Sequence, residues 1–187
     1  FVENQIVARD LFGDGQIYRF STPVNGKGAE IKGLELSASH NFAAFDGLGM
    51  VANYTYVDST SMSTSQITGE NLPFPGLSEV SYNVAVFYEK DGISSRLAYN
   101  YRDKHLVTST GSGVFPLVSP VYADEYASLD ASTSYSFNVQ EIPVSVFVSA
   151  TNLTDEYYRQ VGEGGFNRNH GTVAWGPMYE FGVRVSF

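Results

Sequence analysis

The feature that most constrains the fold of this chain is an alternation of apolar and polar residues with a period of two. In residues 178–187 every second side chain is large and apolar, and small or charged residues stand between them. Successive side chains of a strand point to opposite faces, so the pattern predicts strands with one apolar and one polar face. His40 and Phe147 break the alternation, and no segment has helical periodicity, so we predict an all-β protein. The same alternation marks residues 34–42, 49–58, 80–89, 93–107, 129–137 and 144–151.

The connections between these segments alternate in length. Those at 43–48, 90–92 and 138–143 are short, and Asp-Gly at 91–92 is a strong hairpin signal. The connections at 58–78, 103–125 and 155–176 are long. Short turns at one end and long loops at the other are typical of an antiparallel, up-and-down transmembrane β-barrel. A soluble sandwich is the alternative, but a sandwich has no reason to sort its loops by length.

The composition agrees with a membrane barrel and argues against other classes. Charged residues make up 17% of the chain, below the roughly 25% of soluble domains. No run of about 18 apolar residues predicts a membrane-spanning helix. Cysteine is absent, and the net charge of -9 argues against a nucleic-acid partner. Aromatic residues collect near the ends of the predicted strands, where a barrel carries its interfacial aromatic girdle. Those near the long connections are Tyr54, Tyr56, Tyr82, Tyr99, Tyr101 and Tyr179, and those near the short turns are Phe42, Tyr88, Phe137 and Phe187.

The inward residues of the predicted strands are too small to fill a closed eight-stranded barrel. About eight strands are expected, at 1–9, 16–43, 48–58, 79–90, 93–107, 126–138, 143–153 and 176–187. An eight-stranded barrel fills its interior with side chains. Many inward positions are small and would leave voids: Gly33, Ser37, Ser39, Ala85, Ser132, Ser134, Ser136 and Gly182. We therefore expect an arc of a wider barrel, in which the strand at 1–9 does not pair with the strand at 176–187.

The alternation also predicts which side chains share a face of each strand. One set faces lipid: Leu34, Leu36, Tyr54, Val84, Leu97, Ala131, Val146 and Val183. The other set faces the lumen: Glu35, Asn53, Asn83, Arg96, Asp130 and Arg184. A register error of one residue would invert a whole strand.

Several stretches resemble the late barrel strands of TonB-dependent outer-membrane receptors. They are TPVNGKGAEIKGLELSASHNF, GLGMVANYTYVDST, LPFPGLSEVSYNVAVFYEKDGISSRLAYNYRDKHL, NLTDEYY and YEFGVRVSF. The resemblance implies that residues 1–187 are the last eight strands of a 22-stranded barrel, without its plug domain, its N-terminal strands and its TonB box. The segments PVNGKGAEIKGLEL and ANYTYVDS most resemble the sequences of a proteobacterial subgroup often linked to carbohydrate uptake. Siderophore receptors share much of this sequence pattern.

The resemblance also implies a function and partners. Such a receptor lies in the outer membrane of a Gram-negative bacterium and binds a scarce solute at its external loops. Here the favoured solute is an oligosaccharide, and a siderophore is the second choice. Energy delivered through TonB drives import, and the barrel does no covalent chemistry and needs no cofactor. The further partners implied are outer-membrane lipid and the barrel assembly machinery, which reads the C-terminal aromatic strand ending at Phe187.

Candidate ligand-binding residues concentrate in the last long connection. Sugars are held by aromatic faces and planar polar groups, because their C–H faces are apolar and their hydroxyls need directed partners. The alternative for Tyr157 and Trp175 is a place in the interfacial aromatic belt. The predicted binding residues are Tyr157, Tyr158, Arg159, Phe166, Asn167, Arg168, His170 and Trp175.

Catalytic readings have little support in the sequence. No G-x-S-x-G motif is present, and His40, His105 and His170 lack the spacing of metal ligands. We therefore predict neither catalytic nor metal-binding residues. The alternative that stays open is a small stand-alone outer-membrane barrel with a structural, adhesive or hydrolase role.

Overall fold

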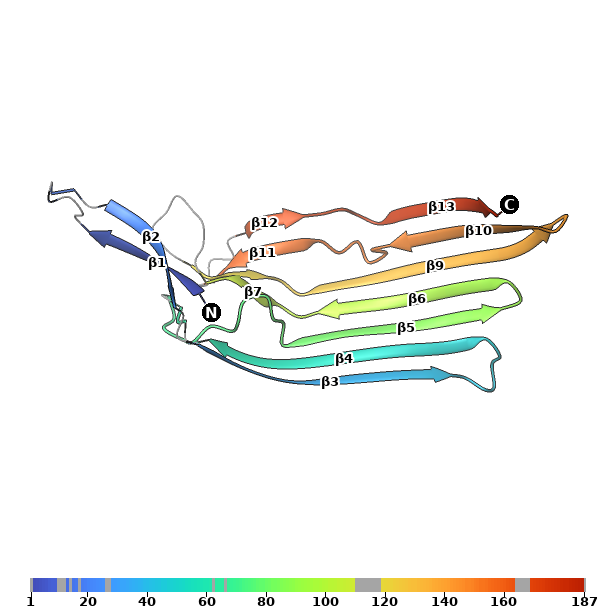
Figure 1. Cartoon of the computed structure of the whole chain (residues 1–187), viewed down its shortest axis with the longest axis horizontal. Helices are drawn as coiled ribbons and strands as arrows, with labels where there is room; N and C mark the ends of the chain where they lie inside the picture. Colours follow the sequence, from blue (N-terminus) through green and yellow to red (C-terminus); the bar gives the residue numbers. More distant parts are fainter. Residues whose placement is uncertain are drawn as a thin grey trace.

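The computed structural model describes residues 2–9, 13, 15–16, 18–25, 28–61, 63–65, 67–109, 119–163 and 169–186. All of its regular structure is β, and the strands pair antiparallel. The main sheet, here called the wall sheet, has seven strands in the order β13-β10-β9-β6-β5-β4-β3 (Figure 1). Its strands are β3 (Ala29–Asn41), β4 (Leu48–Ser61), β5 (Val80–Lys90), β6 (Ile93–Arg102), β9 (Tyr126–Val139), β10 (Ile142–Thr151) and β13 (Met178–Val185). Neighbours in the sheet follow chain order, as the predicted up-and-down topology requires.

A second sheet, here called the end sheet, prolongs four of these strands. Its order β12-β11-β8-β7 repeats the order β13-β10-β9-β6 of the wall sheet. The predicted loops at 103–125 and 155–176 are wrong in part, because each of these connections contains two strands. These strands are too short for an alternation of apolar and polar residues to be visible in the sequence. The strands are β7 (His105–Thr108), β8 (Val121–Ala123), β11 (Tyr158–Gly162) and β12 (Asn169–Val173).

Tight turns join the wall strands at the end opposite the end sheet (Figure 1). Asp91 and Gly92 have φ values of 51° and 80°, and Gln140 and Glu141 have 50° and 71°. Two successive positive φ values define the hairpin turn whose twist matches that of paired strands. The predicted sorting of short turns to one end is confirmed.

The predicted strand at 16–43 is wrong as a single element. It is two strands, β2 (Tyr18–Asn25) and β3, and β2 pairs with β1 (Val2–Arg9) in a separate two-stranded sheet. Gly28 between them has a φ of 104°, a conformation that breaks a strand and that favours glycine. The β1–β2 hairpin lies beyond the end of the wall strands, on the side of the end sheet, and runs at an angle to them (Figure 1).

The register places the two predicted sets of side chains on opposite faces of the wall sheet. Directly opposed residues share a face, and Leu36 pairs with Tyr54, as Val146 pairs with Val183. On the other face Asn53 opposes Asn83. The same cross-strand row continues with Ser37 on β3 and Asn100 on β6. No wall strand described is inverted relative to the prediction.

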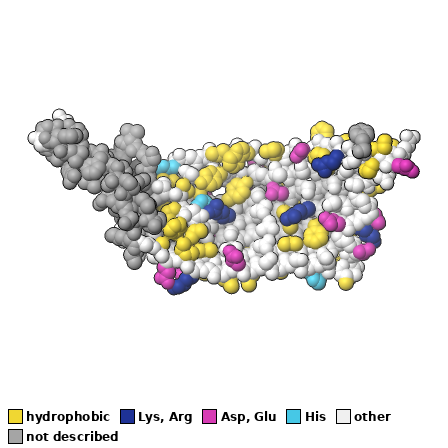
Figure 2. Space-filling view, viewed as in Figure 1, with side chains coloured by type: hydrophobic (Ala, Val, Ile, Leu, Met, Phe, Trp, Pro, Cys, Tyr) yellow, Lys and Arg dark blue, Asp and Glu magenta, His cyan; other side chains and the backbone are white. Residues whose placement is uncertain are grey.

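One face of the wall is apolar and exposed, and the other is polar. Leu36 is 57% exposed and Phe181 is 84% exposed, as bilayer-facing side chains of an isolated wall would be. Near the end sheet, Tyr82 stacks on Tyr101 with ring centroids 4.9 Å apart, within the predicted tyrosine belt. Figure 2 shows charged side chains scattered over the middle of the sheet, with hydrophobic and other side chains between them.

The two exceptions in the alternation have different explanations. Phe147 lies on the polar face opposite Gly182, and a Cβ added to Gly182 would lie 2.6 Å from the Phe147 ring. The ring therefore covers a glycine. His40 lies on the apolar face, where its ring meets that of Phe42 edge-on at 4.9 Å.

The wall sheet is open at both edges. In the part of the chain that the structure describes, β3 pairs only with β4, and β13 pairs only with β10. β1 pairs with β2 and not with β13, which confirms the predicted arc. No helix of the described residues is long and apolar enough to cross a membrane.

Buried side chains gather at the end sheet. Leu72, from the connection between β4 and β5, is 2% exposed, and Leu106 and Ala123 are 0% exposed. The Gly76 amide donates to the Leu106 carbonyl at 2.8 Å, which holds this connection against β7. The end sheet thus has a small core, and the wall beside it has none of comparable size among the described residues.

Candidate functional site

The predicted binding residues fall on both strands of the β11–β12 hairpin. Tyr157 immediately precedes β11, and Tyr158 and Arg159 open it. His170 lies on β12, and Trp175 lies between β12 and β13. Phe166, Asn167 and Arg168 lie outside the described residues.

A buried asparagine positions this hairpin on the wall. Asn152 is 9% exposed and has a φ of 56°, so the chain bends there at the end of β10. Its amide nitrogen Nδ2 donates to the carbonyls of Glu156 and Gly176 at 2.9 and 3.3 Å, and its Oδ1 accepts from the Glu156 amide at 2.9 Å. The Asn152 backbone amide donates to Asp130 Oδ1 at 2.9 Å. The Asn152 side chain therefore ties together the two segments that flank the β11–β12 hairpin, and its backbone amide ties them to Asp130 of β9.

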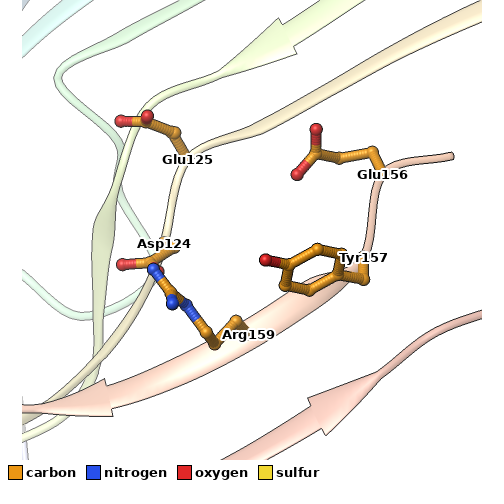
Figure 3. A pocket seen from close by; sticks show the side chains of 5 residues that line it. All are labelled: Asp124, Glu125, Glu156, Tyr157 and Arg159. Atoms are coloured by element: carbon orange, nitrogen blue, oxygen red, sulfur yellow. The ribbon is translucent and has the colours of Figure 1, made fainter. Parts of the chain in front are cut away.

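A pocket of about 280 Å³, here called the end pocket, opens where β8 meets β9 and β10 meets β11. Figure 3 shows its five side chains around a common opening. Because β9 pairs with β10 and β8 pairs with β11, residues of the two connections come to one place. The lining residues are Asp124, Glu125, Glu156, Tyr157 and Arg159.

Arg159 is fully engaged by Asp124. Its Nε donates to Asp124 Oδ2 at 2.5 Å, and its Nη2 forms an ion pair with the same carboxylate. The Asp124 amide also donates to the Arg159 carbonyl at 2.9 Å. The hydrogen bond and charge of Asp124 raise the pKa of the Arg159 guanidinium above its usual value. The cation is therefore permanent, and its charge is already offset.

The other two carboxylates of the end pocket are uncompensated. Among the described residues, neither Glu125 nor Glu156 has a side-chain hydrogen bond or an ion pair. With Asp124 and Arg159 cancelling, the end pocket has an excess of two negative charges. Such a site repels anions, and its carboxylates can accept hydrogen bonds from hydroxyls or cations.

Tyr157 supplies the aromatic surface of the pocket. Its side chain is 45% exposed, and its hydroxyl points across the opening (Figure 3). An exposed ring beside two acceptors combines an apolar face with directed polar groups, the combination that a sugar ring requires.

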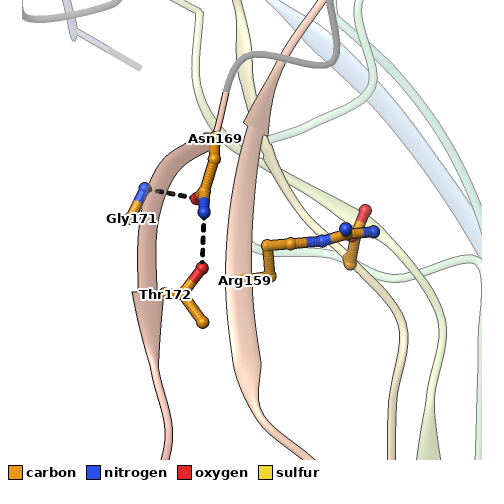
Figure 4. Close-up of polar contacts among 5 residues, drawn as sticks. Arg159, Asn169, Gly171 and Thr172 are labelled. Carbon is orange, nitrogen blue, oxygen red and sulfur yellow. Dashed lines mark hydrogen bonds and ion pairs between the residues drawn. The ribbon is translucent and has the colours of Figure 1, made fainter.

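The residues of β12 do not join the end pocket. Asn169 Nδ2 donates to Thr172 Oγ1 at 2.7 Å, and its Oδ1 accepts from the Gly171 amide at 3.0 Å. Figure 4 shows the Arg159 side chain extending away from this cluster. Trp175 is 65% exposed and is not among the lining residues. The structure thus brings together two of the predicted residues, Tyr157 and Arg159.

Sequence reasoning missed the three acidic residues of the end pocket. Asp124, Glu125 and Glu156 occur in connections, where charged residues are usually solvated. The available signal was their position at two strand junctions that neighbouring strands bring together. No group of three or more His, Cys, Asp or Glu side chains suited to a metal ion occurs among the described residues.

The comparisons with known proteins identify a family. The sequence model of the family described as TonB dependent receptor-like, β-barrel, matches residues 2–153. The end-sheet hairpin and β13 follow this matched stretch. Neither the curated proteins nor the solved structures gave a match. This family comprises receptors and transporters of the Gram-negative outer membrane. Because the match covers most of an open, antiparallel, up-and-down sheet, the chain belongs to the TonB-dependent receptor β-barrel family.

Proposed function

We propose that this chain forms part of the barrel wall of an outer-membrane receptor that binds a neutral oligosaccharide at the end pocket and imports it with energy delivered through TonB. The exposed apolar face then contacts lipid, and the polar face lines the lumen. The bound solute enters between the loops that surround the end sheet. The barrel contributes walls and contacts and no covalent chemistry.

The end pocket carries this proposal. Its free groups are two carboxylates and an exposed tyrosine ring, and its one cation is already paired. Anionic solutes, which include many iron chelates, would meet a net negative site. A neutral sugar places hydroxyls against Glu125 and Glu156 and a C–H face against Tyr157. Oligosaccharide is therefore favoured over siderophore.

The open edges of the wall support a place within a larger barrel. An unpaired strand edge in lipid leaves backbone amides and carbonyls without partners, at a cost of several kcal/mol each. We propose that β3 and β13 pair with further strands, that this chain is the C-terminal part of a 22-stranded barrel, and that a plug domain with a TonB box precedes it. Phe187, the proposed signal for barrel assembly, lies outside the described residues.

Binding by the receptor carrying this chain tests the proposal. Calorimetry with a panel of neutral malto-, cello- and xylo-oligosaccharides should find a ligand, and Tyr157→Ala should weaken its binding roughly tenfold, as loss of a stacking ring typically does. Glu156→Gln should weaken it less, because the amide oxygen still accepts a hydrogen bond. Trp175→Ala is the matched control, an exposed aromatic of the same hairpin outside the pocket, and should bind as wild type. Binding of ferric siderophores but of no neutral saccharide would contradict the proposal.

A further inference from the structure

The ion pair of the end pocket is built into the pairing of two strands. Ala123 of β8 lies opposite Gln160 of β11. The next residues along, Asp124 and Arg159, continue the ladder, because the Asp124 amide donates to the Arg159 carbonyl at 2.9 Å. The Cα atoms of opposed residues on antiparallel strands lie roughly 5 Å apart. Backbone pairing therefore places this carboxylate beside this guanidinium whether or not a solute is bound.

The Asp124 carboxylate holds the guanidinium through two of its nitrogens. Arg159 Nε donates to Asp124 Oδ2 at 2.5 Å, and Nη2 forms an ion pair with the same oxygen. The side chain of Arg159 is 38% exposed and that of Asp124 is 23% exposed, so water screens the pair only in part. Charge-assisted hydrogen bonds are among the strongest that proteins make. An anionic solute would have to compete with a partner that is already in place.

A free guanidinium at this position would favour a different class of solute. Arginine binds carboxylate and phosphate groups through two parallel N–H donors. Arg159 borders the same opening as Tyr157 and Glu156 (Figure 3), and it is the one cation among the lining residues that the structure describes. The choice between an anionic and a neutral solute therefore depends on whether a carboxylate of the protein occupies Arg159.

The three carboxylates of the end pocket differ in this respect. Glu125 and Glu156 contribute negative charge, which repels an anion from a distance and is screened by salt. Asp124 contributes the same charge and also occupies the donors of Arg159. Removing any one of the three lowers the net negative charge by one, but only the removal of Asp124 frees the guanidinium.

We propose that Asp124 is the specificity-determining residue of the end pocket, because it masks Arg159 and thereby excludes solutes that carry a carboxylate or a phosphate. This inference rests on the proposed function, because it takes the neutral oligosaccharide from that proposal. It goes further by assigning the choice between neutral and anionic solutes to one side chain. Such discrimination works by denying the wrong ligand its partner, rather than by adding a contact to the right one.

Calorimetry with the complete receptor measures this selectivity on matched ligand pairs. Each neutral malto- or cello-oligosaccharide is compared with the same sugar carrying one primary hydroxyl oxidised to a carboxylate, and each xylo-oligosaccharide with its glucuronic-acid-branched form. Wild type should favour the neutral member of a pair. Asp124→Asn removes the charge at nearly constant size and should raise the ratio of the anionic to the neutral association constant about tenfold, the effect of one charged hydrogen bond. Asp124→Ser should change this ratio in the same way.

Glu156→Gln is the matched control, because it removes the same charge from the same pocket and leaves the Asp124–Arg159 pair intact. Its ratio should rise by no more than about threefold, the effect of a partly screened charge. Arg159→Met in the Asp124→Asn background removes the freed cation and should cancel the tenfold gain. Wild-type ratios in both Asp124 variants would overturn the assignment. An equal gain in Glu156→Gln, or a gain that persists in the double variant, would also overturn it.

Failure of the proposed function gives a different result. If the wild-type receptor binds no neutral saccharide, the proposed function fails and the role of Asp124 fails with it. If the wild type binds a neutral saccharide and the two Asp124 variants gain nothing for its anionic counterpart, the role of Asp124 fails alone.

Discussion

The end sheet continues four strands of the wall sheet in the same order, but the two sheets bury their apolar residues differently. Leu36 in the wall is 57% exposed, whereas Leu106 in the end sheet is 0% exposed. The wall leaves its apolar face for a surrounding medium to cover, and the end sheet makes its own core with the connection that carries Leu72. Two adjoining antiparallel sheets of one chain can therefore be stabilised by two different environments.

The largest expected effect separates these environments. Leu106→Ala should destabilise the end sheet locally by about 2–5 kcal/mol, because it removes buried methyl groups and leaves a cavity. Leu36→Ala should cost less, because lipid tails fill the space that the side chain leaves. Native-state hydrogen exchange of the receptor in lipid measures both local free energies. Equal losses would show that the two regions do not differ in the proposed way.

The junction between the regions should be the next most sensitive position. Asn152→Ala removes four side-chain hydrogen bonds and places alanine at a φ of 56°, a conformation that asparagine tolerates better than alanine does. The expected local loss is about 2–4 kcal/mol. Asn152→Gly also loses the hydrogen bonds but accepts the positive φ, so it should recover part of the loss. Hydrogen exchange at β11 and β13 measures this local loss of stability. Identical losses in the two variants would contradict a contribution of the positive φ at position 152.

Much of the wall could be predicted from sequence, and most of the end sheet could not. In the wall, period two placed Leu34, Leu36 and Val183 on one face because every wall strand is at least eight residues long. In the end sheet, β8 has three residues, too few for a period to be visible. The end pocket was predicted in part, through Tyr157 and Arg159. Its acidic residues depend on two junctions that meet only after the strands pair, a long-range consequence that local patterns do not contain.

Glycines of the two sheets should respond differently to added side-chain volume. A Cβ on Gly49 would lie 2.3 Å from the Phe87 ring and 2.6 Å from Asn41 Oδ1, so Gly49→Ala should destabilise the wall by about 1–3 kcal/mol. Gly171 in the end sheet has nothing within 4 Å of the same position, and Gly171→Ala should be nearly neutral. Thermal unfolding in detergent compares the two. A neutral Gly49→Ala would mean that the Phe87 ring moves aside without cost.

The smallest expected effect is a pH dependence confined to the end sheet. Burial lowers the pKa of His105 below its usual 6.5, with a smaller contribution from Arg102. The folded end sheet therefore takes up a proton less readily than the opened one. Its stability is complete above the unfolded pKa of about 6.5 and declines as the pH falls below that value. Exchange protection of β7 should fall between pH 7 and pH 5 while that of β4 stays unchanged, after correction for intrinsic exchange rates. His105→Gln should abolish the difference, and a decline that persists in this variant would assign the effect to another group.

The central claim is that one face of the wall meets lipid and the other meets the aqueous lumen, and spin labels along β3 test it most directly. Single cysteines at positions 34 to 39 of the receptor, each carrying a nitroxide, report their exposure to oxygen, which concentrates in lipid, and to a water-soluble nickel complex. We predict that labels at 34, 36 and 38 are accessible to oxygen and that labels at 35, 37 and 39 are accessible to nickel or shielded from both. Uniform nickel accessibility at all six positions, or the opposite phase, would contradict the account.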